Sequence, residues 1–536
     1  MVGDLCMVLL YIIIIVIIYL YISNKNKQID DLNFKIKNQN LNIKDLKKEI
    51  ELLNKKLLDK NIKISKLIDQ ITKLEKHLEN YTEIKNDSLQ LNAIKNEHEN
   101  IEIIDFDSES SQKYDNLSQE QYEIFELMEN TKNNLFITGK AGTGKSYLLK
   151  YFRSKTKKNV LYCAPTGIAA LNINGVTLHS IFGWSNLTDD NFIKLNENQK
   201  KLLKNIDVLV IDEISMVRVD VFSQIDKILK VANKNNILFG GKQIILFGDL
   251  FQLPPVVRND EKKYIESKYG GIFFFHSEAY KKGEFKFKEL ETIFRQTDKE
   301  FITILNNIRI GNISDYEIDL LNKHYVTEVP RRVVQVVSKK KDARQINMEN
   351  LEKFNSPLYE YKAKVLIGEE NIKESDFPIT FNLKLKVGAL VMMINNDLDK
   401  KRWVNGTLGI VSELTEKTVK ITINGKEHEI LPTIFNKRQC KYDETTGKLK
   451  YLIESSVSQY PLILAYAITI HKSQGMTYEQ IACNLDNCFA PGQAYVALSR
   501  CANYDKLYLT KKINKSSIII DDVVSEFYRT IKKEEK

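Results

Sequence analysis

The sequence contains little cysteine, and its cysteines follow no metal-binding or disulfide pattern. The 536 residues include six cysteines, none of which forms a CxxC pair or lies near a ladder of histidines. This spacing argues against a structural zinc site and against a disulfide framework. Cys483 and Cys488 are the closest pair, and a metal or redox role is disfavoured for them as well. We therefore expect the folded part of the chain to work in a reducing compartment.

A strong charge bias is also missing. The formal net charge of +9 comes from 79 basic and 70 acidic residues. Such a mild excess hardly favours a nucleic-acid partner over an ordinary soluble surface. The chain is too long for one core and predicts three or more folded units, at roughly 100–200 residues per domain.

The first residues form a long run without charge. Residues 5–22 read "LCMVLLYIIIIVIIYLYI" and would make a helix about 27 Å long, close to the ~30 Å hydrocarbon core of a bilayer. The run has no basic residue ahead of it and no small-residue cleavage site after it, which favours an uncleaved anchor over a signal peptide. Four lysines follow, so the positive-inside rule predicts a single-pass membrane protein with its remaining residues in the cytosol: Lys25, Lys27, Lys35 and Lys37.

A heptad repeat follows the apolar run. Ile and Leu recur at the first and fourth heptad positions from Ile29 to Tyr81, with polar Gln39 and Lys60 among them. This pattern predicts a parallel two-stranded coiled coil, and hence a homodimer, with a rod about 80 Å long. The alternative is a long amphipathic helix packed on another surface. Residues 82–116 lose the repeat, become acidic and predict a flexible linker.

The segment "GKAGTGKS", Gly139–Ser146, predicts a site for nucleotide phosphates. It follows the strand-like "NLFIT" and precedes the helix-like "YLLKYF", which is the context that a P-loop requires. Backbone N–H groups of the loop would surround the phosphates, while Lys145 reaches the β- and γ-phosphates and Ser146 holds Mg²⁺. The expected ATP-binding residues are Gly139, Ala141, Gly142, Thr143, Gly144, Lys145 and Ser146.

Two further apolar runs end in polar side chains that suit ATP hydrolysis. "IDVLVIDEISMV" carries Asp212 and Glu213 at the end of an expected strand, and "QIILFGDLFQLPPV" carries Gln252. Asp212 suits the Mg²⁺ shell and Glu213 suits polarising the attacking water. Gln252 could sense the γ-phosphate. Paired acids after a strand can also be a simple turn, but behind a P-loop they predict an ATPase of RecA-like α/β architecture.

The successive blocks resemble those of PIF-one-like DNA helicases, in the 5′-to-3′ branch of helicase superfamily one. The blocks include "APTGIAALNINGVTLHSIFGW", "GDLFQLPPV", "IFRQTDKEFITILNNIRIG", "AITIHKSQGMTYEQI" and "GQAYVALSRC". The resemblance covers Leu117 to the C-terminus and nothing before it. It implies that Gln121 in "LSQEQ" contacts adenine, although "SQEQ" is also a good helix start. It further implies that Arg295 and Arg500 are arginine fingers, which are catalytic like Lys145, Glu213 and Gln252.

The family's mechanism implies two grips on a DNA strand, one on each RecA-like domain. Hydroxyl, amide and imidazole groups suit phosphate and sugar contacts that do not read sequence. Phe182 or Trp184 could stack on a base, although aromatic residues after such a loop are more often core. The expected DNA-binding residues are Thr166, His179 and Ser180 on the first domain, and Thr469, His471, Lys472, Ser473 and Gln474 on the second.

The expected fold class is therefore α/β, with two RecA-like P-loop NTPase domains and a small β-barrel insertion, preceded by a transmembrane helix and a coiled coil. "TVKITINGKEHEIL" alternates around Asn424–Gly425 and predicts a hairpin within the insertion. The expected segments are an anchor (1–23), a coiled coil (24–81), a linker (82–116), a first RecA-like domain (117–287), a second (288–399 and 459–536) and the insertion (400–458).

These features predict an ATP- and Mg²⁺-dependent DNA helicase that moves 5′-to-3′ on single-stranded DNA and unwinds forks. The helicase would act in DNA replication, repair, recombination or telomere maintenance. Replication or repair proteins would be its further partners. The anchor would place it at a membrane-bound or viral replication site. Two alternatives stay open, an RNA or RNA/DNA-hybrid helicase and a membrane scaffold with a helicase fold. A scaffold would have no need of Lys145, Asp212, Glu213, Gln252, Arg295 and Arg500 together.

Overall fold

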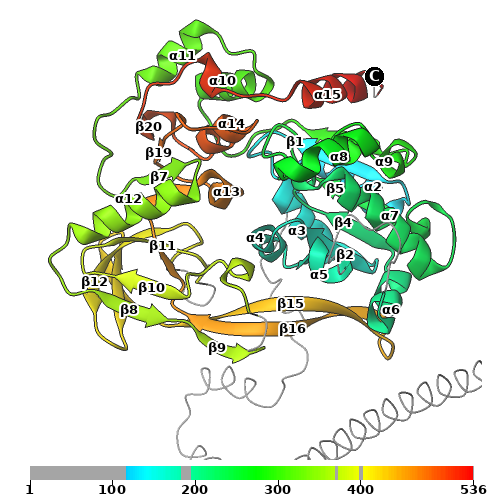
Figure 1. Cartoon of the computed structure of the whole chain (residues 1–536), viewed down its shortest axis with the longest axis horizontal. Helices are drawn as coiled ribbons and strands as arrows, with labels where there is room; N and C mark the ends of the chain where they lie inside the picture. The colour runs from blue at the N-terminus through cyan, green and yellow to red at the C-terminus, as the bar shows by residue number, and fades with distance from the viewer. Residues whose placement is uncertain (1–115, 183–194, 369–371, 398–401, 535–536) are drawn as a thin grey trace, which may run out of the picture. The chain divides into compact units, whose positions relative to one another are not determined.

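The computed structural model describes residues 116–182, 195–368, 372–397 and 402–534 (Figure 1). All of them belong to one compact unit, Glu102–Lys536. The predicted anchor, the predicted coiled coil and residues 82–115 of the predicted linker lie outside the described residues.

The predicted localisation needs correction. Among the described residues, no helix is long and apolar enough to cross a membrane. The longest of them, α7 (Val219–Asn233), has 15 residues, whereas a span needs about 20. The single-pass assignment is therefore not retained, and the segment on which it rested, residues 5–22, lies outside the described part of the chain.

Six parallel strands form the first sheet, in the order β3-β2-β4-β5-β1-β6. Alternate residues of β4 enter different cores: Leu209 and Ile211 pack on one face, Val208 and Val210 on the other. A sheet covered on both faces explains why its strands read as continuous apolar runs. The strands are β1 (Leu135–Gly139), β2 (Val160–Ala164), β3 (Val176–Thr177), β4 (Val208–Ile211), β5 (Gln243–Phe247) and β6 (Lys286–Leu290).

Helices connect these strands and cover the sheet (Figure 1). Ser118 caps α2 through a reciprocal capping box with Gln121, so the helix start expected at "SQEQ" is confirmed. The α-helices are α2 (Gln119–Asn130), α3 (Lys145–Lys155), α4 (Gly167–Asn172), α5 (Leu178–Phe182), α6 (Glu197–Asn205), α7, α8 (Asn259–Tyr269) and α9 (Glu278–Lys281). Short 3-10 turns are η1 (Ile214–Met216), η2 (Leu238–Gly241) and η3 (Phe274–His276).

A second parallel sheet has the order β18-β7-β19-β20. Its strands are β7 (Val334–Val337), β18 (Ala467–Thr469), β19 (Ile481–Cys483) and β20 (Leu507–Leu509). Its helices are α10 (Lys299–Ile310), α11 (Asp315–Asn322), α12 (Lys340–Glu352), α13 (Ile470–Ser473) and α14 (Gln493–Leu498), with the turns η6 (Tyr504–Lys506) and η7 (Lys515–Ser517). Two parallel sheets with flanking helices confirm the α/β class.

Antiparallel strands lie between β7 and β18 in the sequence. The hairpin predicted at Asn424–Gly425 is confirmed, because β13 (Val419–Ile423) and β14 (Lys426–Ile430) pair across it. Both turn residues have positive φ, 49° and 79°, as a two-residue hairpin turn requires. The remaining elements are β8 (Tyr359–Lys362), β9 (Lys364–Ile367), η5 (Glu374–Asp376), β10 (Asn382–Leu385), β11 (Leu390–Met393), β12 (Leu408–Leu414), β15 (Thr433–Asp443), β16 (Lys448–Gln459) and β17 (Leu462–Leu464).

The strands of this region form separate sheets in the part of the chain that the structure describes. The orders are β14-β13-β12-β11-β17, β15-β16-β9 and β10-β8. Strands from β8 to β17 take part, so the region extends on both sides of the predicted insertion, residues 400–458. The sheets that the described residues form do not close into a barrel, and the small β-barrel stays a prediction.

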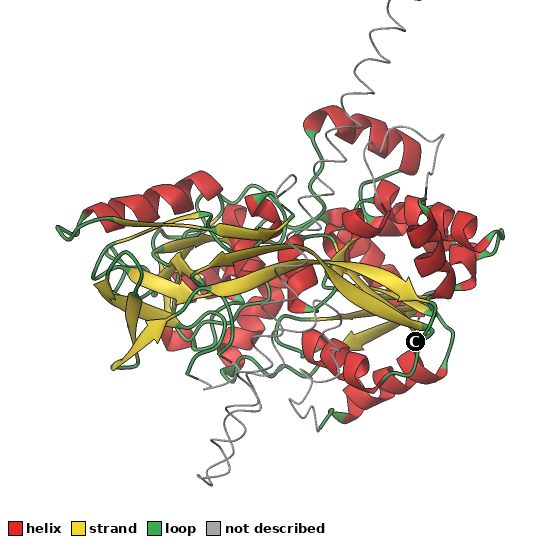
Figure 2. Ribbon diagram, turned by 90° about the horizontal axis from the view of Figure 1, so that it is seen from below, coloured by secondary structure: helices red, strands yellow, loops and turns green. Residues whose placement is uncertain are grey.

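Two segments far along the chain pack back on the first sheet. The β15–β16 hairpin, the long yellow ribbon in Figure 2, places Cys440 in the core around that sheet. Its tip joins α6 through an ion pair of 2.6 Å between Lys201 and Glu444. The C-terminal helix α15 (Asp522–Glu534) buries Val524 and Ile531 in the same core. Neither of these two packing contacts with the first sheet was predicted from the sequence.

Candidate ATP site and nucleic-acid interface

The P-loop joins β1 to α3, as its sequence context predicts. Gly142 and Gly144 adopt φ of 85° and 82°, a region that glycine enters without strain. The Lys145 ammonium group donates to the carbonyl oxygens of Gly139 (2.5 Å) and Lys140 (3.0 Å). Burial lowers the pKa of Lys145, while Asp249, Glu213 and Asp212 act in the opposite direction. The ammonium group thus lies over its own loop, where phosphate oxygens would replace the carbonyls as its partners.

Gln121 lies against this loop. Its amide nitrogen donates to the Thr143 carbonyl at 3.5 Å, while its amide oxygen accepts from the Ser118 N–H at 3.1 Å. A side chain added at Gly144 would come within 2.5 Å of that amide nitrogen, which shows how closely Gln121 approaches the loop. Phe294 is 58% exposed and contacts the same glycine position. Sequence analysis singled out Gln121 and missed Phe294, whose exposed ring is a flat apolar surface beside the loop.

The paired acids follow β4 at the carboxyl edge of the sheet. Burial, offset by the Glu213 N–H and by Lys145, raises the pKa of Asp212 to about 6. Burial and the neighbouring Asp212 raise the pKa of Glu213 to about 7. Glu213 also has a φ of 51°, in the left-handed region that non-glycine residues rarely adopt. Two carboxyl groups with raised pKa values beside a P-loop suit metal binding and proton acceptance.

Gln474 joins the two halves of the site. Its amide nitrogen donates to the Glu213 carboxylate at 2.9 Å and to the Gln252 amide oxygen at 3.3 Å. Glu213 and Gln252 follow strands of the first sheet, whereas Gln474 follows α13 of the second. The structure therefore places Gln474 in the candidate ATP site, although the sequence favoured a DNA contact for it.

The two expected arginine fingers meet at Ser499. Arg295 donates to the Ser499 carbonyl at 3.0 Å, and its Cβ lies close to the position that a side chain on Gly142 would occupy. Arg500 is 2% exposed and donates to the Ser499 hydroxyl at 2.9 Å. Burial and Arg500 lower the pKa of Arg295, and burial lowers that of Arg500, opposed in part by Glu213. Arg295 thus lies beside the P-loop, and the Arg500 guanidinium group lies near Glu213.

Two residues that the sequence analysis did not single out support this arrangement. Tyr495 of α14 accepts a hydrogen bond of 2.8 Å from the Ala141 N–H of the P-loop. Gln296 donates to the carbonyls of Ser499 (3.1 Å) and Cys501 (2.9 Å). A buried tyrosine and a buried glutamine carry no local sequence signal, because both types are common in ordinary cores.

Arg309 is a fourth residue that sequence analysis missed. It ends α10 of the second sheet and makes a bidentate ion pair with Asp249 of the first, with the closest contact at 2.9 Å. The two side chains are 3% and 0% exposed. Asp249 is thus already paired with an arginine, which leaves Asp212 as the carboxylate better placed to face a metal ion.

The donor set around the P-loop fits Mg²⁺. Among the described residues, no group of three or more His, Cys, Asp or Glu side chains could hold a metal by itself. Mg²⁺ does not need such a group, because it usually takes one or two protein oxygen ligands together with substrate phosphates and waters. The Ser146 hydroxyl and the Asp212 carboxylate supply hard oxygen atoms of that kind.

The first-domain residues expected to bind DNA lie beyond β2 and β3. Thr166 caps α4, where its hydroxyl oxygen accepts from the Ala169 N–H at 3.2 Å. His179 and Ser180 are exposed on α5, and the Ser180 hydroxyl donates to the Thr177 carbonyl at 2.8 Å. Phe182 is a buried core residue, as its apolar context favoured, and Trp184 lies outside the described residues.

The second-domain candidates divide into two groups. Lys472 is exposed and His471 is half-buried on α13, so both can reach a strand. Thr469 is 5% exposed and caps α13 by accepting from the Lys472 N–H at 3.3 Å. Ser473 is 0% exposed and donates to the Ile470 carbonyl at 2.8 Å. Ser473 is therefore enclosed in this conformation and does not present its hydroxyl to a strand.

α13 approaches α4 across the space between the sheets. A side chain at Gly475 would lie 3.6 Å from the Asn172 amide nitrogen. The run "SKKKDAR" after β7 adds positive charge here. Burial is the main cause that lowers the pKa of the half-buried His471, and Lys340 from this run lowers it further. Sequence analysis missed this run because three adjacent lysines usually mark only a solvated surface.

The fold and site define a P-loop ATPase whose nucleotide site is completed by a second parallel α/β sheet. The model of the PIF1-like helicase family matches residues 116–319. ATP-dependent DNA helicase Pif1 of Campylobacter jejuni is 35% identical over 440 residues, which cover 74% of this chain and 94% of that protein.

Solved structures agree with that match. Pif1 from Bacteroides in complex with ADP-AlF4 has a TM-score of 0.72 at 37% identity, covering 78% of this chain and 98% of that one. Bacteroides Pif1 bound to single-stranded DNA has a TM-score of 0.59 at 38% identity over the same shares. The chain belongs to the PIF1-like helicase family. It is an ATP-dependent DNA helicase, and hence an enzyme that hydrolyses ATP.

Proposed function

We propose that this helicase moves 5′-to-3′ along single-stranded DNA and unwinds forked duplexes during DNA replication, repair, recombination or telomere maintenance. The observation that carries the proposal is the bridge from Gln474 to Glu213 and Gln252, because it links the second sheet to the residues that would act on the γ-phosphate. Bacteroides Pif1 is described bound to single-stranded DNA, and another matching structure is described as two coordinating Pif1 helicases that unwind forked duplex DNA. Both descriptions support the substrate class.

The ATP-binding role falls to the P-loop and its neighbours. Residues 139–146 would surround the phosphates with backbone N–H groups, and Lys145 would exchange its two carbonyl partners for phosphate oxygens. The adenine would lie between the Gln121 amide and the exposed Phe294 ring, since both adjoin Gly144. Ser146 and Asp212 would hold Mg²⁺, which neutralises developing charge on the phosphates.

The hydrolytic role falls to residues from both sheets. Glu213 accepts a proton from the attacking water, and its raised pKa makes it a stronger base than an ordinary glutamate. Gln252 and Gln474 orient that water and the γ-phosphate. Arg295 and Arg500 stabilise the transition-state charge once the cleft closes on ATP. Because these groups come from both sheets, hydrolysis and release would loosen the contact between them.

The DNA-binding role falls to α4, α5 and α13. Thr166, His179 and Ser180 would hold the strand on one side. His471 and Lys472 would hold it on the other, with Thr469 capping the helix that carries them. Contacts of this kind hold phosphates without reading bases. Alternate tightening of the two sides, driven by closure of the ATP cleft, would advance the strand. The antiparallel region, for which a small barrel remains our prediction, would guide it.

A tailed-duplex assay tests the proposal. The full chain with ATP and Mg²⁺ should unwind a duplex with a 5′ single-stranded tail and leave one with a 3′ tail intact. Equal unwinding of both, or unwinding only from the 3′ tail, would contradict the polarity. Matched RNA and RNA/DNA tails in the same assay distinguish a DNA track from the RNA and hybrid alternatives.

We also propose that residues 24–81 make the chain a dimer through a parallel coiled coil. The heptad pattern from Ile29 to Tyr81 supports it. Light scattering of the full chain should give twice the 62.2 kDa of one chain. A mass of 62.2 kDa at micromolar concentration would contradict the dimer.

A further inference from the structure

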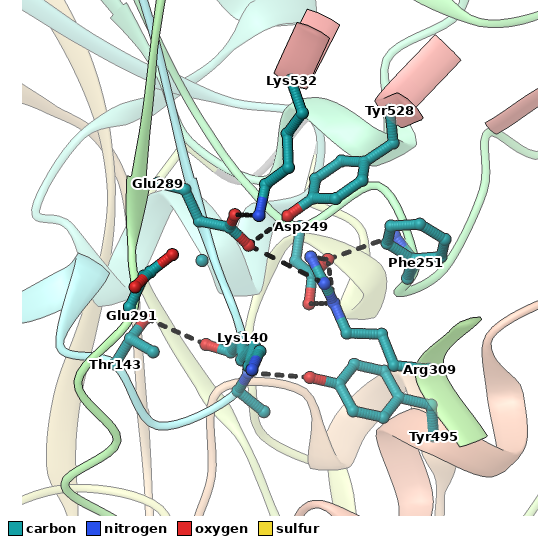
Figure 3. Close-up of polar contacts among 12 residues, drawn as sticks. Lys140, Thr143, Asp249, Phe251, Glu289, Glu291, Arg309, Tyr495, Tyr528 and Lys532 are labelled. Atoms are coloured by element: carbon teal, nitrogen blue, oxygen red, sulfur yellow. Dashed lines mark hydrogen bonds and ion pairs between the residues drawn. The ribbon is translucent and has the colours of Figure 1, made fainter. Parts of the chain in front are cut away.

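One glutamate in the described chain has partners from two distant helices. Glu289 lies on the edge strand β6, and its side chain is 6% exposed. Its carboxylate accepts a hydrogen bond from the Tyr528 hydroxyl and pairs with Lys532 at 2.5 Å, both on α15. Arg309 of α10 lies 3.8 Å from the same carboxylate. Figure 3 shows these side chains converging beside the P-loop residues Lys140 and Thr143.

Arg309 lies between the two acids of this cluster. It faces Glu289 on one side and makes the bidentate pair with Asp249 on the other. The rings of Phe251 and Tyr528 flank its guanidinium group at 4.4 Å and 5.1 Å. A buried guanidinium keeps one orientation only while its carboxylate and aromatic partners are in place. The position of Arg309 therefore depends on α15 as well as on Asp249.

Asp249 in turn makes hydrogen bonds that hold the turn on which Gln252 lies. Its carboxylate accepts from the Phe251 N–H at 3.2 Å, and its carbonyl accepts from the Gln252 N–H at 2.9 Å. The Gln252 side chain then contacts Gln474 at 3.3 Å. A continuous series of contacts thus runs from α15 through Glu289, Arg309 and Asp249 to the turn that faces the γ-phosphate side of the site.

α15 is held firmly enough on the first sheet to act in this way. Phe527 stacks on Phe275 at 4.0 Å with an interplanar angle of 4°, and Val524 and Ile531 are buried. The segment before the helix stays with the second sheet, where the Ile519 carbonyl accepts from the Gly492 N–H at 3.1 Å. The C-terminal residues therefore connect both sheets at the nucleotide end of the site.

We propose that α15 is a positioning element for ATP hydrolysis, in which Tyr528 and Lys532 act through Glu289 and Arg309 on the Asp249–Gln252 turn. The inference rests on the proposed function of the ATP site and adds residues that touch neither ATP nor DNA. A helix that only stabilised the fold would show a different behaviour. Substitutions of polar residues in such a helix would lower the melting temperature and leave the turnover of the folded enzyme unchanged.

The test uses the full chain and steady-state ATP hydrolysis at saturating single-stranded DNA. Tyr528→Phe keeps the ring that packs on Phe251 at 5.1 Å and removes only the hydroxyl. Lys532→Ala removes the ion pair, and Lys532→Arg restores a cation at the same place. Lys533→Ala is the matched control, because the adjacent Lys533 is exposed.

We expect Tyr528→Phe and Lys532→Ala each to lower kcat about tenfold with KM for ATP changed by less than about threefold, as for an interaction that acts in the transition state. Lys532→Arg should recover most of kcat, and Lys533→Ala should match the wild type. Unchanged kcat in folded Tyr528→Phe and Lys532→Ala would overturn the inference. A wild-type chain without DNA-stimulated hydrolysis would instead overturn the proposed function, so the two failures are distinguishable.

Discussion

The amide nitrogen of Gln474 donates a hydrogen bond to the Glu213 carboxylate at 2.9 Å, across the space between the two parallel sheets. Glu213 is the residue best placed to accept a proton from water, because burial raises its pKa. The carboxylate that we propose to be catalytic follows a strand of one sheet and is held by a side chain from the other. This relationship couples hydrolysis to the relative position of the two sheets, and it has measurable consequences.

Gln474→Ala should damage hydrolysis and spare DNA binding. Loss of a hydrogen bond to a carboxylate costs ~1.5–3 kcal/mol, so we expect DNA-stimulated kcat to fall about tenfold or more. The Kd for single-stranded DNA without nucleotide should stay within about twofold of the wild type. Measuring both by ATP hydrolysis and fluorescence anisotropy separates the two roles. A large loss of DNA affinity with normal kcat would show that Gln474 contacts DNA and does not act in ATP hydrolysis.

Lys472→Ala should have the opposite effect. Lys472 is exposed on α13, where an ammonium group can neutralise one phosphate. Removing it should weaken DNA binding for all sequences and reduce the slope of log Kd against log salt by about one. Titrations at several salt concentrations measure this, with Lys155→Ala on the far end of α3 as control. An unchanged slope would show that Lys472 makes no phosphate contact.

The two proposed arginine fingers should control kcat far more than ATP affinity. Arg500→Lys and Arg295→Lys keep a charge but lose the planar fork that stabilises the transferring phosphoryl group. We expect each to reduce kcat by about 10³-fold. ATP-analogue binding, measured by calorimetry, should change by less than about fivefold. Equal losses in kcat and in affinity for the ATP analogue would show that the two arginines contribute to ATP binding and not specifically to the transition state.

The pH dependence of hydrolysis should report Glu213. The raised pKa of about 7 means that this carboxyl is protonated, and unable to accept a proton, over part of the acidic range. We therefore expect kcat/KM for ATP to rise about tenfold per pH unit below about 7 and to level above it. A flat profile between pH 5.5 and 8, at an unchanged fraction of folded protein, would contradict this role.

The same pKa shift predicts an effect on stability. An acid whose pKa rises from 4.5 to about 7 on folding holds a proton in the folded state that the unfolded state releases. Its contribution to stability is therefore lost as the pH rises through that interval. Glu213→Gln should raise the melting temperature more at pH 8 than at pH 5. A larger gain at pH 5 would contradict the sign.

Local sequence could predict the residues whose chemistry depends on short spacing. The P-loop, the acids after β4 and the helix cap at Ser118 each lie within a few residues of the signal that identifies them. The hairpin at Asn424–Gly425 was predictable for the same reason, since only a tight turn needs two residues with positive φ.

Contacts between distant segments could not be predicted in this way. Gln474 and Ser473 are neighbours in a polar motif, yet one faces Glu213 and the other is enclosed. Arg309 ends an ordinary amphipathic helix, and only the tertiary fold brings it to Asp249. The expected membrane anchor is a different case, because there a local apolar run was interpreted as a membrane span. No helix among the described residues is long and apolar enough to cross a membrane.

The most direct measurement is ATP hydrolysis by the full chain, with and without single-stranded DNA, for the wild type and for Lys145→Ala. Lys145 lies over the P-loop at 2.5 Å from the Gly139 carbonyl, so its replacement by alanine removes the ammonium group from the phosphate site. We predict strong stimulation by DNA in the wild type and at least a ~100-fold lower kcat in the variant. Hydrolysis indifferent to DNA, or undiminished in Lys145→Ala, would contradict a DNA motor driven from this site.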